Sequence, residues 1–321
     1  MRYAIGVDIG GGSTKLGLVS QDGKILASSR LGALPDETGD DFVQRLSVEI
    51  ASLAGTGCKV AGIGIGYPGP IHPGNLSGGI GNVPGLIDFP LAATLTAATG
   101  LPVRLENDAT AAALAEARFG AGNGSTRLLM VTAGTGIGVA MVIGGAAMVT
   151  SGGCLGDTGH LIVDGHLDRR CRLGCVGCLE AFASAEALDD LAEAEALRHP
   201  DGAIAVDASR MGGKADTSTL IRCALDGDAT AQATLSDAGK WIGRAVASWI
   251  HTFAPDAVVI GGGVMAVGDF LLAPLEAEAR RCAMQSYTTG LRFAAASLGN
   301  DAGVIGAAVQ FFEPALDMGR Y

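Results

Sequence analysis

Residues 3–31 read YAIGVDIGGGSTKLGLVSQDGKILASSRL. This segment contains three short stretches with the composition of strands, at Tyr3–Asp8, Thr14–Ser20 and Lys24–Leu31. A run of glycines separates the first two stretches, and Asp22-Gly23, a strong hairpin signal, separates the last two. The chain is therefore expected to open with a β-meander.

Strand and helix patterns alternate after this meander. Strands are expected at 61–66 and 103–106, and helices at 41–53, 91–99 and 108–118. Alternation of this kind is typical of an α/β fold.

The opening pattern returns in the middle of the chain. Glycine and small polar residues at 120–125 precede strands expected at 127–133, 138–143 and 146–149. Helices are then expected at 181–197, 218–225 and 229–253, and a strand at 257–260. The repetition predicts two related α/β domains with a ligand-binding cleft between them. We expect the first domain to comprise 1–117, with a C-terminal helix at about 302–321 packing back on it, and the second to comprise 118–301.

Composition excludes several classes of protein. The chain has 321 residues, of which 48% are hydrophobic and 17% charged, which is a well-buried globular composition. A net charge of −11 disfavours a nucleic-acid binder, which would need a basic face. We find neither a signal-peptide pattern nor an apolar run long enough to span a bilayer, so we expect a cytoplasmic protein that does not contact membranes.

Glycine-rich turns are the first candidate functional feature. Backbone N–H groups of such turns can converge on a polyphosphate, although an ordinary hairpin turn would explain any one of them. Asp8 directly precedes the first turn, where its carboxylate could bind Mg²⁺ directly or through water. The candidate phosphate-binding residues are Gly10, Gly11, Gly12, Ser13, Thr14 and Lys15 in the first turn, Gly134, Thr135 and Gly136 in the second, and Gly261, Gly262 and Gly263 in the third.

Asp108 is the second candidate feature. Glu106-Asn107-Asp108 ends an expected strand and starts an expected helix. An aspartate in this position can simply cap the helix. Because glycine turns occur on both sides of it in the sequence, we interpret Asp108 as a general base.

Together these motifs resemble the ROK family (repressors, open reading frames and kinases) of the actin-like ATPase superfamily. The resemblance runs in order from Ala4 to about Phe312 and includes Glu106-Asn107-Asp108-Ala109, Gly156-Asp157-Thr158-Gly159-His160 and Cys178-Leu179-Glu180. It implies two actin-like (ribonuclease H-like) domains with mixed sheets flanked by helices and the active site in the interdomain cleft. It also implies an ATP-dependent hexose kinase, similar to glucokinases, that forms a homodimer.

The resemblance assigns roles to individual residues. It makes Asp108 the catalytic base that deprotonates a sugar hydroxyl. Asp157 stands where glucokinases of the family usually have glutamate, so the carboxylate is kept but is one methylene shorter. The residues expected to contact the sugar are Asn82, Asn107, Asp108, Asp157, His160 and Glu180.

A zinc site is expected at His160, Cys171, Cys175 and Cys178. One histidine and three thiolates suit a closed, tetrahedral and hence structural site. The second cysteine of the family's zinc motif corresponds to Leu173, and we expect Cys175 to replace it. The alternative is a group of buried, reduced thiols with an ordinary surface histidine.

Other departures leave alternatives open. Gly12 stands where the family usually has threonine, and Lys15 either lies near phosphate or is simply solvated. The first turn also resembles a phosphate motif of exopolyphosphatases, so hydrolysis of a polyphosphate, or polyphosphate as the donor, is an alternative. Kinases of N-acetylglucosamine, N-acetylmannosamine, fructose or allose are further alternatives. A sugar-binding transcriptional regulator is disfavoured, because a DNA-binding domain would precede Asp8, which lies close to Met1.

Overall fold

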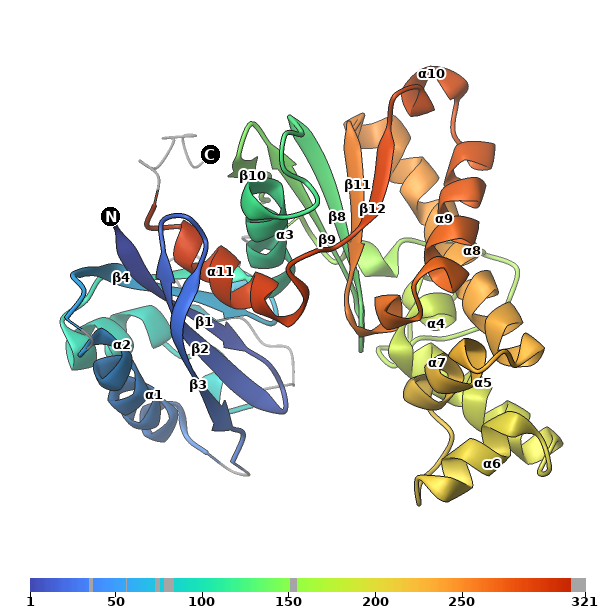
Figure 1. The fold of residues 1–321 in the computed structure, drawn as a ribbon, viewed down its shortest axis with the longest axis horizontal. Coiled ribbons are helices and arrows are strands. Elements are labelled where there is room, and N and C mark those ends of the chain that lie inside the picture. Colours follow the sequence, from blue (N-terminus) through green and yellow to red (C-terminus); the bar gives the residue numbers. More distant parts are fainter. Residues whose placement is uncertain (35–36, 56, 73–75, 78–83, 151–154, 313–321) are drawn as a thin grey trace. The chain divides into compact units, whose positions relative to one another are not determined.

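The computed structural model describes residues 1–34, 37–55, 57–72, 76–77, 84–150 and 155–312. The chain forms two compact units (Figure 1). The first comprises Met1–Leu128, Ala140–Gly156 and Ser297–Tyr321, and the second comprises Leu129–Val139 and Asp157–Ala296. No helix of the described residues is long and apolar enough to cross a membrane.

The first sheet has the order β3-β2-β1-β4-β7. Antiparallel pairing joins β1 to β2 and β2 to β3, whereas β4 is parallel to both β1 and β7, so the sheet is mixed as expected. The opening meander is confirmed. The strands are β1 (Tyr3–Ile9), β2 (Ser13–Ser20), β3 (Ile25–Gly32), β4 (Val60–Tyr67) and β7 (Val103–Asn107).

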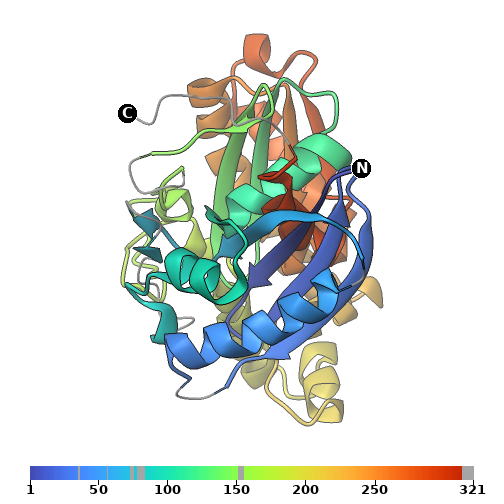
Figure 2. The same ribbon diagram turned by 90° about the vertical axis from the view of Figure 1, so that its left-hand side faces the viewer.

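Helices cover the two faces of this sheet in different ways (Figures 1 and 2). One face carries large apolar side chains such as Ile5 and Ile65, which join Phe42 and Leu46 in a common core. The helices on the two faces are α1 (Gly39–Ala54), α2 (Leu91–Thr99), α3 (Asp108–Phe119) and α11 (Ala302–Val309).

The other face of the sheet is lined by glycine. A Cβ on Gly6 would lie 1.9 Å from the Val304 carbonyl oxygen, and a Cβ on Gly64 would lie 1.8 Å from that of Ala307. Gly6 and Gly64 are in register in the parallel pair β1/β4, and residues in register point to the same face of a sheet. Helix α11 therefore packs with its backbone directly against β1 and β4.

The second sheet repeats this plan in the order β10-β9-β8-β11-β12. Its strands are β8 (Arg127–Ala133), β9 (Ile137–Ile143), β10 (Ala146–Ala147), β11 (Ala257–Gly261) and β12 (Arg292–Ala295). The third strand of each meander is on one edge, the first strand is central, and the later strands extend the sheet on the other side. The predicted duplication of a mixed α/β layer is confirmed.

The described helices of the second unit match the sequence expectations only in part. The helix expected at 181–197 is two helices, α4 (Glu180–Ala183) and α5 (Ala185–Arg198), because Ser184 is extended and its hydroxyl accepts from the N–H of Ala187 as a cap. Helices α7 (Thr217–Leu225) and α8 (Ala229–Phe253) lie where helices were expected. The helices that were not expected are α6 (Ala203–Arg210), α9 (Asp269–Cys282) and α10 (Gln285–Thr288).

Glu116 in α3 is fully buried and joins two distant segments of the first unit. Its carboxylate accepts from the backbone N–H groups of Ser297 at 2.9 Å, Leu298 at 2.8 Å and Ala121 at 2.7 Å. Ser297 and Leu298 lead directly into the turn before α11. The carboxylate thus fixes the approach of α11 to α3.

We predict that Glu116→Ala destabilises the first unit by about 3 kcal/mol or more, because three backbone N–H donors lose the buried carboxylate that they share. Glu193→Gln is the matched control, since Glu193 makes a surface ion pair with Lys214. We expect the control to change stability by about 0.5 kcal/mol or less. Urea unfolding measures both values, and equal midpoints for Glu116→Ala and the wild type would contradict the assignment.

Candidate functional site

The carboxyl ends of three parallel strands carry the main candidate residues of the first unit. Asp8 of β1 is in register with Gly66 of β4, and Gly66 is in register with Glu106 of β7. Ligands of α/β proteins commonly bind at this edge of a sheet. Asp8 and Asp108 are therefore near neighbours, although one hundred residues of sequence separate them.

Asn107, and not Asp108, caps helix α3. The side-chain oxygen of Asn107 accepts from the N–H of Thr110 at 3.1 Å, and its amide nitrogen donates to the carbonyl of Gly69 at 3.2 Å. Asp108 is the first helical residue, and its Oδ1 accepts from the N–H of Ala109 at 2.7 Å. Because Asn107 fills the capping role, capping does not explain Asp108.

Burial raises the pKa of Asp108 to about 6. The negative charge of Asp8 raises it further, whereas the hydrogen bonds from Ala109 and Asn107 oppose the shift. A carboxylate with this pKa is still mostly ionised at neutral pH, yet it binds a proton more readily than an exposed aspartate does. The side chain has the acid–base properties of a general base.

Asp8 lies between a lysine and the first turn of α11. Its Oδ2 is 3.7 Å from Lys15 Nζ, and burial raises its pKa while Lys15 lowers it. A Cβ on Gly303 would lie 2.6–2.8 Å from the carboxylate atoms of Asp8, so a larger residue there would displace this carboxylate. Sequence reasoning missed Gly303, whose role depends on this long-range contact.

The first glycine turn is exposed at Gly10, Gly11 and Gly12, and the N–H of Gly10 donates to the carbonyl of Ser13 at 3.1 Å. Thr14 is buried within β2. Lys15 is paired with Asp8 and donates to the carbonyl of Asn300 at 3.3 Å, so the alternative of a merely solvated lysine is not supported.

The other two glycine turns lie together in the second unit. Gly262 has a φ of +91°, and a Cβ there would lie 2.2 Å from the carbonyl oxygen of Ala133, the residue before Gly134. Both constraints exclude other residues at position 262. The turns 134–136 and 261–263 are thereby held side by side at the ends of β8 and β11.

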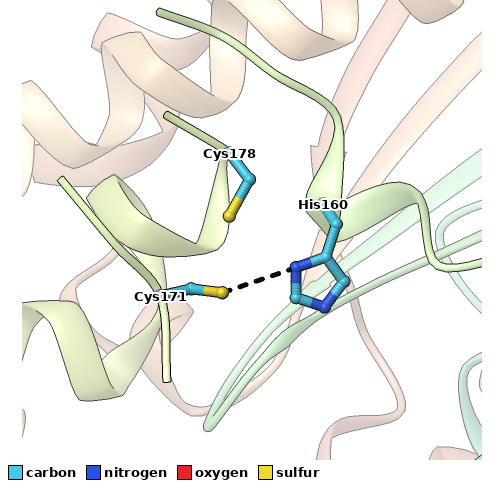
Figure 3. A group of neighbouring side chains, drawn as sticks. All are labelled: His160, Cys171 and Cys178. Carbon is cyan, nitrogen blue, oxygen red and sulfur yellow. Dashed lines mark hydrogen bonds between the residues drawn. The ribbon is translucent and has the colours of Figure 1, made fainter. Parts of the chain in front are cut away.

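His160, Cys171 and Cys178 form a compact group in the second unit (Figure 3). Their potential ligand atoms all lie within 4.8 Å of one another, and His160 Nδ1 is 3.7 Å from Cys171 Sγ. Tetrahedral zinc with bonds of about 2.0–2.3 Å requires nitrogen and sulfur ligands about 3.6 Å apart. The donor set and its spacing therefore fit zinc.

Cys175, the expected fourth ligand, is not one of the residues whose ligand atoms come together in this group. Its side chain is exposed, and its thiol interacts with that of Cys171. The backbone of Cys171 donates to the carbonyl of Cys175 at 3.0 Å, which closes a tight turn around Leu173. Burial raises the pKa of Cys178 to about 11, so a bound cation would be needed to stabilise its thiolate at neutral pH.

The expected sugar contacts divide between the two units. Asn107 and Asp108 belong to the first, whereas Asp157, His160 and Glu180 belong to the second. His160 Nε2 lies 3.5 Å from Glu180 Oε2, and Asp157 is exposed. Asn82 lies outside the described residues.

Comparison with known proteins identifies the family. A sequence model described as "ROK family" matches residues 4–313. The chain belongs to the ROK family.

Individual ROK relatives are similar over almost their whole length. A glucokinase from Thermotoga maritima is 35% identical over 308 residues, which cover 95% of each chain. The structure of a ROK family glucokinase from Streptomyces griseus in complex with glucose and AMPPNP has a TM-score of 0.81 at 31% identity, covering 95% of this chain and 98% of that one. A ROK hexokinase from Thermus thermophilus has a TM-score of 0.76 at 33% identity, covering 96% and 97% of the two chains.

The raised pKa of Asp108 implies that its ionisation lowers the free energy of unfolding. An acid whose pKa is higher in the folded state than in the unfolded state destabilises the folded state when it is ionised. This destabilisation is therefore absent well below about pH 4 and complete above about pH 6. We predict that Asp108→Asn raises the free energy of unfolding by about 2 kcal/mol at pH 7.5 and leaves it unchanged at about pH 3. Chemical unfolding at both pH values measures this, and a destabilised variant at pH 7.5 would contradict it.

A second prediction concerns the group formed by His160, Cys171 and Cys178, which we call the metal group. We expect about one zinc ion per chain, lost in Cys171→Ser and Cys178→Ser because each substitution removes a thiolate ligand. Cys223→Ser, which changes a buried cysteine of α7, is the matched control and retains zinc. Elemental analysis of the purified variants measures the content. Full zinc content in Cys175→Ser would contradict Cys175 as the fourth ligand.

Proposed function

We propose that this protein is an ATP-dependent hexose kinase of the glucokinase type, in which Asp108 is the general base. The single observation that carries the proposal is the Asp108 carboxylate, which has a pKa of about 6 and stands beside Asp8 at the carboxyl ends of β1, β4 and β7. The glucokinase relatives support the class of reaction.

The environment of Asp108 suits the proton transfer that such a kinase requires. A sugar hydroxyl must lose its proton as its oxygen attacks the γ-phosphate of ATP. Asp108 is mostly ionised at pH 7 and can accept that proton, and the burial that raises its pKa favours the neutral acid that results. We propose that Asn107, whose side chain is fixed by its hydrogen bonds with Thr110 and Gly69, holds the sugar beside the base.

Asp8 is the proposed Mg²⁺ residue. Its carboxylate is a hard oxygen ligand that is held in place by Lys15 and the first turn of α11, which fits a cation. Bound Mg²⁺ supplies charge neutralisation for the phosphate oxygens of ATP. We propose that Lys15 and the exposed turn at Gly10–Ser13 contact phosphate, and that the turns 134–136 and 261–263 are further nucleotide contacts.

The proposed metal group has a structural role on the sugar side. His160, Cys171, Cys178 and the proposed fourth ligand Cys175 would hold zinc, which orders the segment 160–178 without taking part in phosphoryl transfer. His160 and Glu180 are proposed sugar contacts, as are Asp157 and Asn82. We further propose that the protein is a cytoplasmic homodimer.

A coupled assay of ADP release tests this function over glucose, mannose, fructose, allose, N-acetylglucosamine and N-acetylmannosamine. We expect at least one hexose to stimulate ADP release by about 10² or more above the rate without sugar, because the sugar supplies the nucleophile and water is excluded. Glucose is expected to give the highest kcat/KM.

The same assay discriminates the alternatives. Stimulation by an N-acetylhexosamine but not by glucose would keep the kinase and change the substrate. Release of phosphate without any sugar would replace the kinase with a hydrolase. A protein that binds a sugar but phosphorylates it neither from ATP nor from polyphosphate would be a sugar-binding regulator. That result would contradict the proposal.

A further inference from the structure

Glu180 makes two contacts that a role in sugar binding does not require. It is the first residue of α4, and only 19% of its side chain is exposed. Its Oε1 accepts from the backbone N–H of Ile137 at 2.7 Å, while its Oε2 faces His160 Nε2 at 3.5 Å. The two oxygens of one carboxylate thus contact two different segments.

The segment at Ile137 contains the second glycine turn. Ile137 begins β9 directly after Gly134-Thr135-Gly136, and the N–H of Gly134 donates to the carbonyl of Gly136 at 2.9 Å. The hydrogen bond from Ile137 to Glu180 therefore fixes the end of this turn. It is a charge-assisted bond, of the stronger kind.

Glycines make room for the carboxylate on both sides. A Cβ on Gly136 would lie 2.5 Å from Glu180 Oε1. A Cβ on Gly159 would lie 3.1 Å from the same oxygen and 2.3 Å from the carbonyl oxygen of Ile137. The turn, the segment before His160 and the carboxylate are thus packed without intervening side chains.

His160 continues the chain of contacts to the metal group. Its Nδ1 faces Cys171 Sγ at 3.7 Å, and its Nε2 faces Glu180 (Figure 3 shows the two ring nitrogens pointing in different directions). A histidine whose Nδ1 binds a metal carries its ring proton on Nε2, where it can be donated to a carboxylate. A histidine without the metal can carry that proton on Nδ1, and its Nε2 lone pair then faces the carboxylate of Glu180.

We propose that Glu180 is a positioning residue that couples the metal group to the glycine turn 134–136. With metal bound, His160 donates to Oε2 and holds the carboxylate so that Oε1 receives the N–H of Ile137. Without metal, Glu180 loses this partner and the turn loses its fixed end. The inference rests on the proposed zinc and phosphate-binding roles. It adds that metal binding at His160 orders the proposed nucleotide contact at 134–136 as well as the proposed sugar contacts.

Hydrogen exchange of the Ile137 amide tests the coupling without any catalytic assay. Zinc-loaded wild-type protein and the same protein treated with a chelator are compared by mass spectrometry or NMR. We expect chelation to speed exchange at Ile137 by about tenfold or more, because the amide loses a fixed acceptor. A peptide from β11 (Ala257–Gly261), which is fully buried, reports on general unfolding and is expected not to change.

Two variants make the test specific. Glu180→Gln keeps an acceptor for Ile137 but presents an amide where His160 needs a carboxylate, so we expect the effect of chelation on Ile137 to vanish. We also expect this variant to lose zinc to a chelator about 10–100 times more readily. Glu186→Gln is the matched control, because Glu186 of α5 pairs with Arg172 near the cysteines and is expected to behave as wild type in both measurements.

The outcomes are separable from those of the kinase assay. Equal exchange at Ile137 with and without zinc in the wild type would overturn the coupling, as would an unchanged response in Glu180→Gln or a protein that binds no zinc. A protein that shows the coupling but has no sugar-dependent turnover would retain this inference and lose the proposed function. A protein with sugar-dependent turnover but without the coupling would retain the proposed function and lose this inference.

Discussion

The close approach of α11 to the glycine-lined face of the first sheet is the constraint on which the rest of the first unit depends. Where other sheets present side chains, β1 and β4 present Gly6 and Gly64, and the helix backbone fills the space. Gly306 of α11 makes a similar contact, since a Cβ there would lie 1.7 Å from the carbonyl oxygen of Ala111 in α3. Sheet, α11 and α3 are therefore held at backbone distance, and the buried carboxylate of Glu116 fixes the segment that leads into α11.

This packing places the chemistry. Because α11 lies so close to β1, its first turn reaches Asp8, and Gly303 leaves space for that carboxylate. Because α3 begins where β7 ends, Asn107 caps the helix and Asp108 is its first residue. Two carboxylates then share one partly buried edge of the sheet, and burial together with the like charge raises the pKa of Asp108 to about 6. The properties of the proposed base thus follow from the backbone packing around it.

Features that depend on short-range sequence signals could be predicted, and features that depend on tertiary contacts could not. The Asp22-Gly23 turn and the alternating patterns located the first meander, and the repeated pattern predicted the second sheet. The break at Ser184 was missed although Ser184 and Glu186 are typical of a helix start, and α6 was missed as well. Asp108 was found from its place between strand and helix, but its raised pKa arises from burial. The bond from Ile137 to Glu180 spans 43 residues and has no local signal.

Rapid-quench measurement of phosphoryl transfer in Asp108→Asn tests most directly whether Asp108 takes the proton of a sugar hydroxyl during transfer from ATP. Sugar and Mg-ATP binding are measured by calorimetry on the same sample. We expect transfer to slow by about 10²–10⁴ while both ligands bind within about threefold of wild type, because asparagine keeps the size and polarity of the side chain but cannot accept the proton. Transfer at the wild-type rate in this variant, with sugar bound, would show that Asp108 is not the base.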